Sequence, residues 1–152
     1  MNRLNKYVTF KIGDQWFGLI LSNVERIIRA VEVTPLPQAP EVVAGVINFQ
    51  GRIIPVVNIR GRFSFPCREI GLNDQFIIAN TSRRTVAVVA DAVGDVVERP
   101  EQEIVAAGEI MPDIEYVEGV IKLEDGMILI LDLGRLLFHE EEQILKNAME
   151  EM

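Results

Sequence analysis

Short apolar segments separated by turn-forming residues make up most of this chain. Six segments are rich in valine, isoleucine, leucine and aromatic residues, and each has the length and composition of a β-strand. They are residues 7–12, 16–21, 53–59, 75–79, 85–90 and 127–133. Turn formers follow three of these segments, and two of the turns, Gly13-Asp14 and Glu124-Asp125-Gly126, predict tight hairpins. The pattern therefore predicts a mainly β protein.

Three other segments have different patterns. Residues 22–29 predict one or two helical turns, with Ser22 or the next residue as the N-cap. Residues 34–40 contain three prolines, which exclude a helix, so this stretch is expected to be extended. Over residues 133–152 apolar residues recur at helical spacing, and Asp132 is suited to cap the start. This last pattern predicts a C-terminal helix.

The second half of the chain repeats the first. The matched segments are 41–47 with 115–121 and 53–59 with 127–133 at an offset of 74, and 16–20 with 85–89 at an offset of 69. Coincidence among β-rich segments is the alternative reading, but the glycines align as well as the apolar residues do. We therefore expect Gly45 and Gly119 to be equivalent, within two similar small β-barrels packed face to face. Lobe one should cover about 16–80 and lobe two about 85–137, within a single domain of residues 1–152.

Composition and charge narrow the classes of partner. The 152 residues are 49% hydrophobic and 25% charged, which suits one domain with a packed core. The formal net charge of −8 makes nucleic acid and an anionic membrane surface poor partners, because neither gives an acidic protein any counterion-release energy. We expect no insertion into a membrane, because the longest apolar runs have only strand length. With no signal peptide and a single cysteine, the expected location is the cytoplasm.

Residues that could carry catalysis are few. The one histidine, His139, lies in an acidic stretch and is interpreted as a surface residue, while Cys67 is interpreted as a small hydrophobic residue. Asp91 and Asp95 are interpreted as residues that cap a turn rather than as an acid–base pair. No metal-ligand set and no nucleotide-binding motif is present in the sequence, so we expect no metal, no cofactor and no enzyme activity. A binding module is the class that this leaves.

A motif in the first half of the chain points to a particular family. Residues 43–60, VAGVINFQGRIIPVVNIR, closely resemble the signature of CheW-like domains, a Gly-Val-Ile-Asn-Leu-Arg-Gly core followed by an Ile-Pro-Val-Val-Asp-Leu-Arg strand. The resemblance extends over roughly residues 6–138. It implies two five-stranded SH3-like barrels with short helices and a C-terminal helix at 133–152, and an N-terminal strand that crosses into the second barrel.

The resemblance also implies a function. Proteins of this type are non-enzymatic scaffolds in chemotaxis signal transduction, and they couple methyl-accepting chemoreceptors to the histidine kinase CheA. One barrel binds the regulatory CheW-like domain of the kinase, and the groove between the barrels binds the cytoplasmic tip of the receptor. The protein would then be cytoplasmic and associated with receptor arrays. Carried over to this chain, the candidate receptor-groove residues are Val24, Glu25, Arg26, Ile27, Gly45, Val46, Ile47, Asn48, Gln50 and Gly51.

Three positions depart from the family pattern. Gln50 replaces an arginine, Arg26 stands where an acid is common, and Asn58 replaces an aspartate. If Arg26 and Gln50 face each other, they can form one hydrogen bond, and Glu25 is the rival that could take over the role of the acid. The departures favour an alternative reading, a specialised paralogue for a pilus or developmental signalling system without standard receptor contact. A small β-barrel enzyme or metabolite binder is a third reading from another class.

Overall fold

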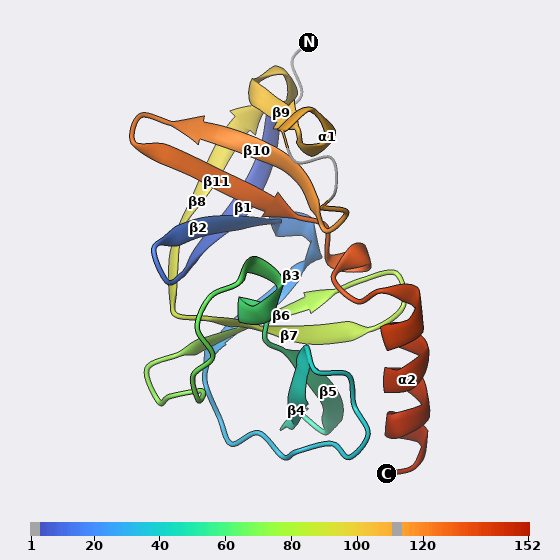
Figure 1. Cartoon of the computed structure of the whole chain (residues 1–152). Coiled ribbons are helices and arrows are strands. Elements are labelled where there is room, and N and C mark those ends of the chain that lie inside the picture. The colour runs from blue at the N-terminus through green and yellow to red at the C-terminus, as the bar shows by residue number, and fades with distance from the viewer. Residues whose placement is uncertain (1–3, 111–113) are drawn as a thin grey trace.

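The computed structural model describes residues 4–110 and 114–152, and all of its named strands belong to two sheets (Figure 1). One sheet has the order β3-β6-β7-β5-β4 and is called lobe one from here on; the other has the order β8-β1-β2-β11-β10-β9 and is called lobe two. The strands are β1 (Leu4–Ile12), β2 (Gln15–Ile20), β3 (Val24–Arg29), β4 (Val43–Phe49), β5 (Arg52–Val57), β6 (Gln75–Asn80), β7 (Thr85–Ala90), β8 (Ala92–Pro100), β9 (Ile104–Ala106), β10 (Val117–Leu123) and β11 (Gly126–Leu131).

Helices are few and short. The α-helices are α1 (Ala107–Ile110) and α2 (His139–Glu150), and single 3₁₀ turns are η1 (Leu21–Asn23), η2 (Arg60–Phe63), η3 (Glu101–Glu103) and η4 (Leu133–Arg135). The predicted mainly β class is therefore confirmed. Both predicted hairpins are also present, since two residues connect β1 to β2 and two connect β10 to β11.

Strand pairing confirms the internal repeat. Both ladders of the Gly-Val-Ile segments shift register at the same point, and all four partners differ by 74 between the lobes. The matched pairs are Val43–Val57 and Gly45–Val56 in lobe one, and Val117–Leu131 and Gly119–Ile130 in lobe two. The offset of 69 relates β3 to β8 and β1 to β6 in the same way, since Val24 pairs with Ala79 and Val93 pairs with Phe10. The two lobes therefore repeat one strand order.

The two aligned glycines have the same role. A Cβ atom at Gly45 would collide with the backbone oxygen of Thr34, and one at Gly119 would lie 2.7 Å from Cγ2 of Ile104. In both lobes a neighbouring segment thus passes close to the glycine, and a Cβ atom would force it to shift. Gly45 and Gly119 are equivalent, as predicted.

The predicted lobe boundaries are wrong in one respect. Residues 16–20 were assigned to lobe one and residues 85–90 to lobe two, but β2 pairs in parallel with β11, and β7 pairs in parallel with β5. The β1–β2 hairpin therefore belongs to lobe two, although β3 after it belongs to lobe one. The β6–β7 hairpin belongs to lobe one, although β8 after it belongs to lobe two. Lobe one is formed from residues 24–90, and lobe two from residues 4–20 together with residues 92–131. The N-terminal strand does lie in lobe two.

Two predicted helices also need correction. Residues 24–29 form the strand β3 rather than helical turns, and only η1 at 21–23 is helical. The β-branched side chains of this segment favour a strand, and pairing with β6 supplies the backbone hydrogen bonds. At the C-terminus, the helix begins at His139 rather than at residue 133, because the preceding leucines pack into the core in a 3₁₀ turn capped by Asp132.

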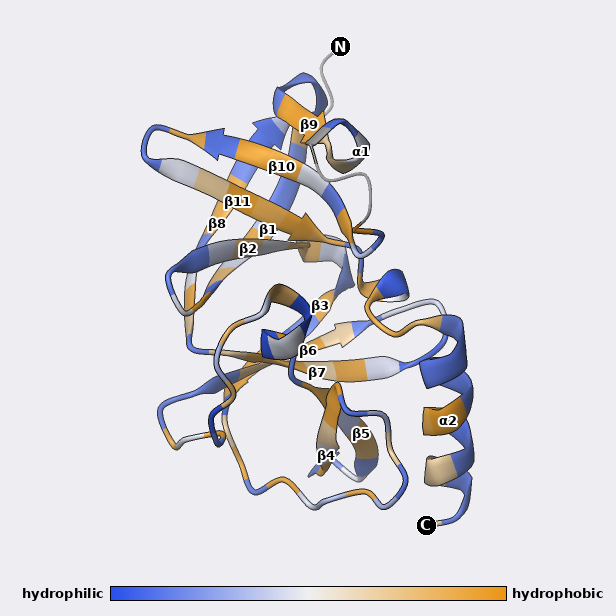
Figure 2. Ribbon diagram, viewed as in Figure 1, coloured by the Kyte–Doolittle hydropathy of each residue, from blue (hydrophilic) through white to orange (hydrophobic). Residues whose placement is uncertain are grey.

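Hydrophobic residues are frequent on the strands of both lobes, while α2 is largely hydrophilic with hydrophobic residues between (Figure 2). The largest core cluster spans both lobes and includes Phe10 and Phe17 of lobe two, Val57 and Ile77 of lobe one, and Leu145 of α2. A smaller cluster lies within each lobe. The seam between the lobes is therefore apolar, and the surface-exposed parts of β3 and of the β4–β5 hairpin lie outside it. No helix among residues 4–110 and 114–152 is both long and apolar enough to cross a membrane.

Candidate functional site

The candidate groove residues lie on two edges of lobe one. Residues 24–27 begin β3, and residues 45–51 run along β4 into the turn before β5. In the order of the sheet these two strands are the outermost ones, yet the guanidinium of Arg52 pairs with the carboxylate of Glu25. The sheet must curl to bring them together, so β3 and the β4–β5 hairpin form one continuous surface.

Only part of the predicted set is available to a partner. Val46 and Ile47 are 4% and 2% exposed, and Gly45 lies under Thr34, so these three residues belong to the core and the groove assignment is wrong for them. The family motif identifies β4 but not which of its side chains face outward. Val24 is half-buried against the shared core. The exposed members are Glu25, Arg26, Ile27, Asn48, Gln50 and Gly51.

Three further residues complete this surface, and the sequence analysis did not single them out. Phe49 is almost buried, and the guanidinium carbons of Arg26 and Arg52 lie 6.0 Å and 5.6 Å from the centroid of its ring. Ile53 is 43% exposed, next to Arg52 on β5, and Ile27 on β3 is 37% exposed. Of the three, Ile53 could have been found from the sequence. It directly follows the hairpin turn, and the first two residues of β5 are exposed. We call the exposed residues of β3 and of the β4–β5 hairpin the lobe-one face.

The β4–β5 turn fixes how this surface is displayed. Phe49 pairs with Arg52, so the turn is a two-residue hairpin, and both central residues have positive φ, 52° at Gln50 and 83° at Gly51. This is the conformation of a type I′ turn. The side-chain oxygen of Asn48 accepts a hydrogen bond from the amide of Gly51 at 3.0 Å. The turn therefore projects Gln50 outward at its tip.

The structure decides between Glu25 and Arg26 as the partner of the hairpin. No hydrogen bond joins Arg26 to Gln50 among the residues that the structure describes, so the predicted pair is not formed. Glu25 instead accepts hydrogen bonds from Arg52 and, at 3.5 Å, from Asn80. The hydrogen bond from Arg52 is the main cause that lowers the pKa of Glu25, so this carboxylate is ionised at neutral pH. The rival reading, in which Glu25 supplies the acid, is the one that the structure supports.

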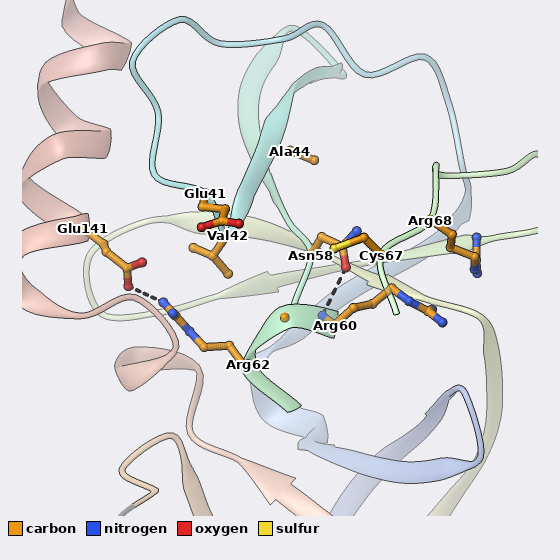
Figure 3. A pocket seen from close by; sticks show the side chains of 10 residues that line it. Glu41, Val42, Ala44, Asn58, Arg60, Arg62, Cys67, Arg68 and Glu141 are labelled. Carbon is orange, nitrogen blue, oxygen red and sulfur yellow. Dashed lines mark hydrogen bonds and ion pairs between the residues drawn. The ribbon is translucent and has the colours of Figure 1, made fainter. Parts of the chain in front are cut away.

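A cavity of about 270 Å³ lies on another side of lobe one, between η2, the start of β4 and the first turn of α2 (Figure 3). Three arginines line it, and each is held by a carboxylate: Arg60 by Asp91, Arg62 by Glu141, and Arg68 by both Asp74 and Asp91. The positive charges of these arginines are therefore neutralised by carboxylates of the protein itself. Cys67, also at this cavity, is exposed, so its interpretation as a small, semi-buried hydrophobic residue is wrong.

The structure corrects in part the interpretation of Asp91 and Asp95 as caps of one turn. Asp91 accepts hydrogen bonds from the amide of Gly13 at 2.8 Å and from Arg60 at 2.7 Å, while Asp95 is exposed. Asp91 thus caps the β1–β2 turn rather than the turn in which it lies, and its role is structural. In the described part of the chain, no three histidine, cysteine or acidic residues are placed to hold a metal ion. The surface best suited to a partner is the lobe-one face.

Comparison with known proteins identifies the family. The model of the CheW-like domain matches residues 6–141. A chemotaxis protein CheW of Rhizobium meliloti is 30% identical over 138 residues, which cover 90% of this chain and 89% of the relative, and one of Treponema pallidum is 27% identical over 146 residues, which cover 92% and 86%. The crystal structure of the scaffolding protein TtCheW from Thermoanaerobacter tengcongensis superposes with a TM-score of 0.81 at 30% identity and covers 93% of this chain and 96% of that one.

This chain therefore shares its fold of two β lobes with a protein described as a scaffold, and the family model matches most of its length. The chain belongs to the CheW-like domain family.

Proposed function

We propose that this protein is a non-enzymatic cytoplasmic scaffold that couples methyl-accepting chemoreceptors to the histidine kinase CheA. Membership of the family and the likeness to a protein described as a scaffold support the proposal. The observation that carries it is the lobe-one face, where two isoleucines stand exposed among charged side chains. Exposed apolar residues ringed by polar ones are the pattern of a protein-binding surface.

The proposal assigns one partner to each of two surfaces. The helical tip of the receptor binds the lobe-one face and the adjoining groove, as in other helix-in-groove contacts. The CheW-like domain of the kinase binds elsewhere on a barrel. A scaffold that couples two partners must hold both at the same time, so binding of one partner must leave the surface for the other free.

Calorimetry with each partner tests this. Titration with the kinase domain and with a receptor tip should each release or absorb heat, and Ile27→Asp should weaken receptor binding by about tenfold or more, because truncating or charging a central contact costs at least about 1.4 kcal/mol. Kinase binding should not change. Leu72→Asp is the matched control, since Leu72 is 89% exposed and lies in a loop away from β3. Absence of binding to either partner at high micromolar concentration contradicts the proposal.

A specialised paralogue is the second candidate function, serving a pilus or developmental signalling system without standard receptor contact. Arg26, exposed and joined to no carboxylate by an ion pair in the described residues, favours it, because a free guanidinium changes the charge that a partner meets. Protein FrzA of Myxococcus xanthus is also similar, 31% identical over 88 residues. Binding to the kinase domain with no binding to receptor tips, together with recovery of other partners in a pull-down of the native protein, is the result that favours this candidate.

A further inference from the structure

Two arginines of the lobe-one face approach one aromatic ring, and only one of them is neutralised. The guanidinium carbon of Arg52 lies 5.6 Å from the ring centroid of Phe49, and the same guanidinium pairs with the carboxylate of Glu25. The guanidinium carbon of Arg26 lies 6.0 Å from that centroid, but its side chain forms no ion pair and no hydrogen bond with the residues that the structure describes. The lobe-one face therefore keeps one unbalanced positive charge at a defined position.

The ring of Phe49 restricts where this charge can lie. Phe49 is only 9% exposed and belongs to the core cluster within lobe one, so it is a fixed platform for the guanidinium beside it. A cation held against an aromatic ring loses part of its side-chain freedom before any partner arrives, and pairing with it then costs less conformational entropy. Arg29, at the other end of β3, contacts no aromatic ring in the described part of the chain. Arg26 is therefore the better prepared of the two cations on β3.

Glu25 is engaged by the hairpin, although it directly precedes Arg26 in the chain. The hydrogen bond from Arg52 is the main cause that lowers the pKa of Glu25, and a hydrogen bond from Asn80 lowers it further. The charge of Arg26 is the smallest of the causes that act on this carboxylate. Glu25 therefore neutralises Arg52 and leaves Arg26 for a partner.

The repeat shows that the fold does not require this arrangement. In lobe two the offsets of 69 and 74 replace all four residues, so that the ring, the ion pair and both arginines are lost. Glu25 and Arg26 become Gly94 and Asp95, and Phe49 and Arg52 become Leu123 and Gly126. A lobe of the same strand order thus forms without these side chains, and in lobe one they are available for recognition.

We propose that Arg26 determines which receptor tips this protein accepts, by pairing with a carboxylate that the tip presents beside the apolar residues packed on Ile27 and Ile53. Glu25 sharpens the choice, because it keeps Arg52 from attracting the same acid. The rest of the protein supports this selection: with a net charge of −8 it repels an acidic segment, so a carboxylate of the partner is favoured only where a free cation receives it. The inference rests on the proposed function, since the occupant of the face is the receptor tip.

Calorimetric titration of the full chain with the receptor tip provides the test. Arg26→Gln should weaken binding about fivefold, the value of one exposed ion pair. Glu25→Gln should have the opposite effect and strengthen binding about twofold, because it frees the guanidinium of Arg52 for the same carboxylate. Lys146→Gln on α2 is the matched control, since Lys146 is exposed and its replacement, like that of Arg26, changes the net charge from −8 to −9. This control should bind the tip like the natural protein.

Variants of the tip then locate the carboxylate. Each exposed aspartate or glutamate of the tip is replaced singly by its amide. One of these changes should weaken binding to the natural protein about fivefold but leave binding to the Arg26→Gln variant unchanged, as a coupled pair requires. An Arg26→Gln variant that binds the tip like the natural protein, a Glu25→Gln variant that binds it more weakly, or additive effects in every tip variant would overturn this inference alone. A natural protein that binds no tip would overturn the proposed function as well, so the two failures are distinguishable.

Discussion

Two segments each leave one lobe and pack on the other, and they are held in different ways; we call them the first and the second connection. One follows β5 and runs from Asn58 to Asp74; the other follows β11 and runs from Asp132 through α2. Asn58 and Asp132 are equivalent in the repeat, and each chain segment leaves its own sheet and packs on the other lobe (Figure 1). The same topological task is thus solved once with a loop and once with a helix.

The first connection depends on polar contacts. The carboxylate of Asp91, at the crossing between β7 and β8, receives Arg60, Arg68 and the amide of Gly13. Asp74 holds the far end of the loop through two hydrogen bonds from Arg68, at 2.8 Å and 2.6 Å. Apolar packing adds two anchors: Ile59 is 0% exposed in the shared core, and the ring of Phe63 lies 4.8 Å from that of Phe17.

The second connection depends on apolar burial. Leu145 is 0% exposed and Ala148 is 4% exposed, both within the core shared by the lobes. Ion pairs from Glu141 to Arg62 and from Glu142 to Arg84 lie beside them. A loop without regular structure needs side-chain acceptors for its position to be fixed, whereas a helix satisfies its own backbone and needs only a face to bury. The two connections should therefore respond differently to the same kind of change.

The largest effect is expected from the apolar anchor of α2. Leu145→Ala removes a fully buried side chain and should lower the free energy of unfolding by about 2–5 kcal/mol, measured by urea denaturation. Ile144→Ala, one residue earlier and 45% exposed, is the control and should change stability little. Equal losses in the two variants would show that α2 is not anchored through its buried face.

A smaller loss is expected at the polar hub of the first connection. Asp91→Asn keeps the shape of the side chain but removes the charge that holds two arginines, so it should cost about 1–3 kcal/mol. Asp95→Asn, on the exposed part of β8, should cost almost nothing. Hydrogen exchange should show faster exchange in residues 60–73 of the first variant. Unchanged exchange there would remove Asp91 as the hub.

A carboxylate change in the second connection should cost less again. Glu141→Gln weakens the ion pair with Arg62 but keeps an oxygen for the backbone amide of Phe138, now bonded at 3.0 Å. We expect a loss of about 0.5–1.5 kcal/mol, the value of one ordinary hydrogen bond, in the same urea assay. A loss as large as that of Asp91→Asn would mean that both connections rest on charge, and the contrast between them would fail.

The last expected effect is seen only at low pH, where acid should loosen the first connection. Hydrogen bonding from Arg68 is the main cause that holds the pKa of Asp74 below its ordinary value of 3.8. A depressed pKa in the folded state contributes stability that is fully present above the unfolded pKa and is lost as the pH falls through the folded one. Exchange of residues 60–73 should therefore rise below about pH 4. Asp74→Asn should abolish this pH dependence, and Asp95→Asn should retain it.

The repeat was readable from sequence because aligned apolar residues and glycines report local strand geometry. The sheet to which each strand belongs was not readable in this way. The turn after Ile20 sends the chain into the other lobe, and nothing in residues 16–20 distinguishes them from a strand whose successor stays in the same lobe. The segment at 24–29 was mistaken for a helix because Val24, Ile27 and Ile28 fit both periods over so short a run. Pairing with β6, a tertiary contact, decides it.

The candidate site was predictable only in part. The resemblance assigned residues 24–27 and 45–51 to one surface, but it included Val46 and Ile47, which are buried. The choice of Glu25 over Arg26 as partner of the hairpin required the geometry of Arg52, two residues beyond Gln50.

Because lobe two is built from both ends of the chain, synthesis on the ribosome completes the lobes in a fixed order. All strands of lobe one have been made once Ala90 has emerged, but β2, which ends at Ile20, waits about 110 residues for β11. At about 5–20 residues per second this delay lasts roughly 5–20 s. Phe17, 0% exposed in the finished protein, spends that time without its partner Leu129 on β11. The N-terminal hairpin is thus the segment of a nascent chain most open to chaperones and to mispairing with another copy.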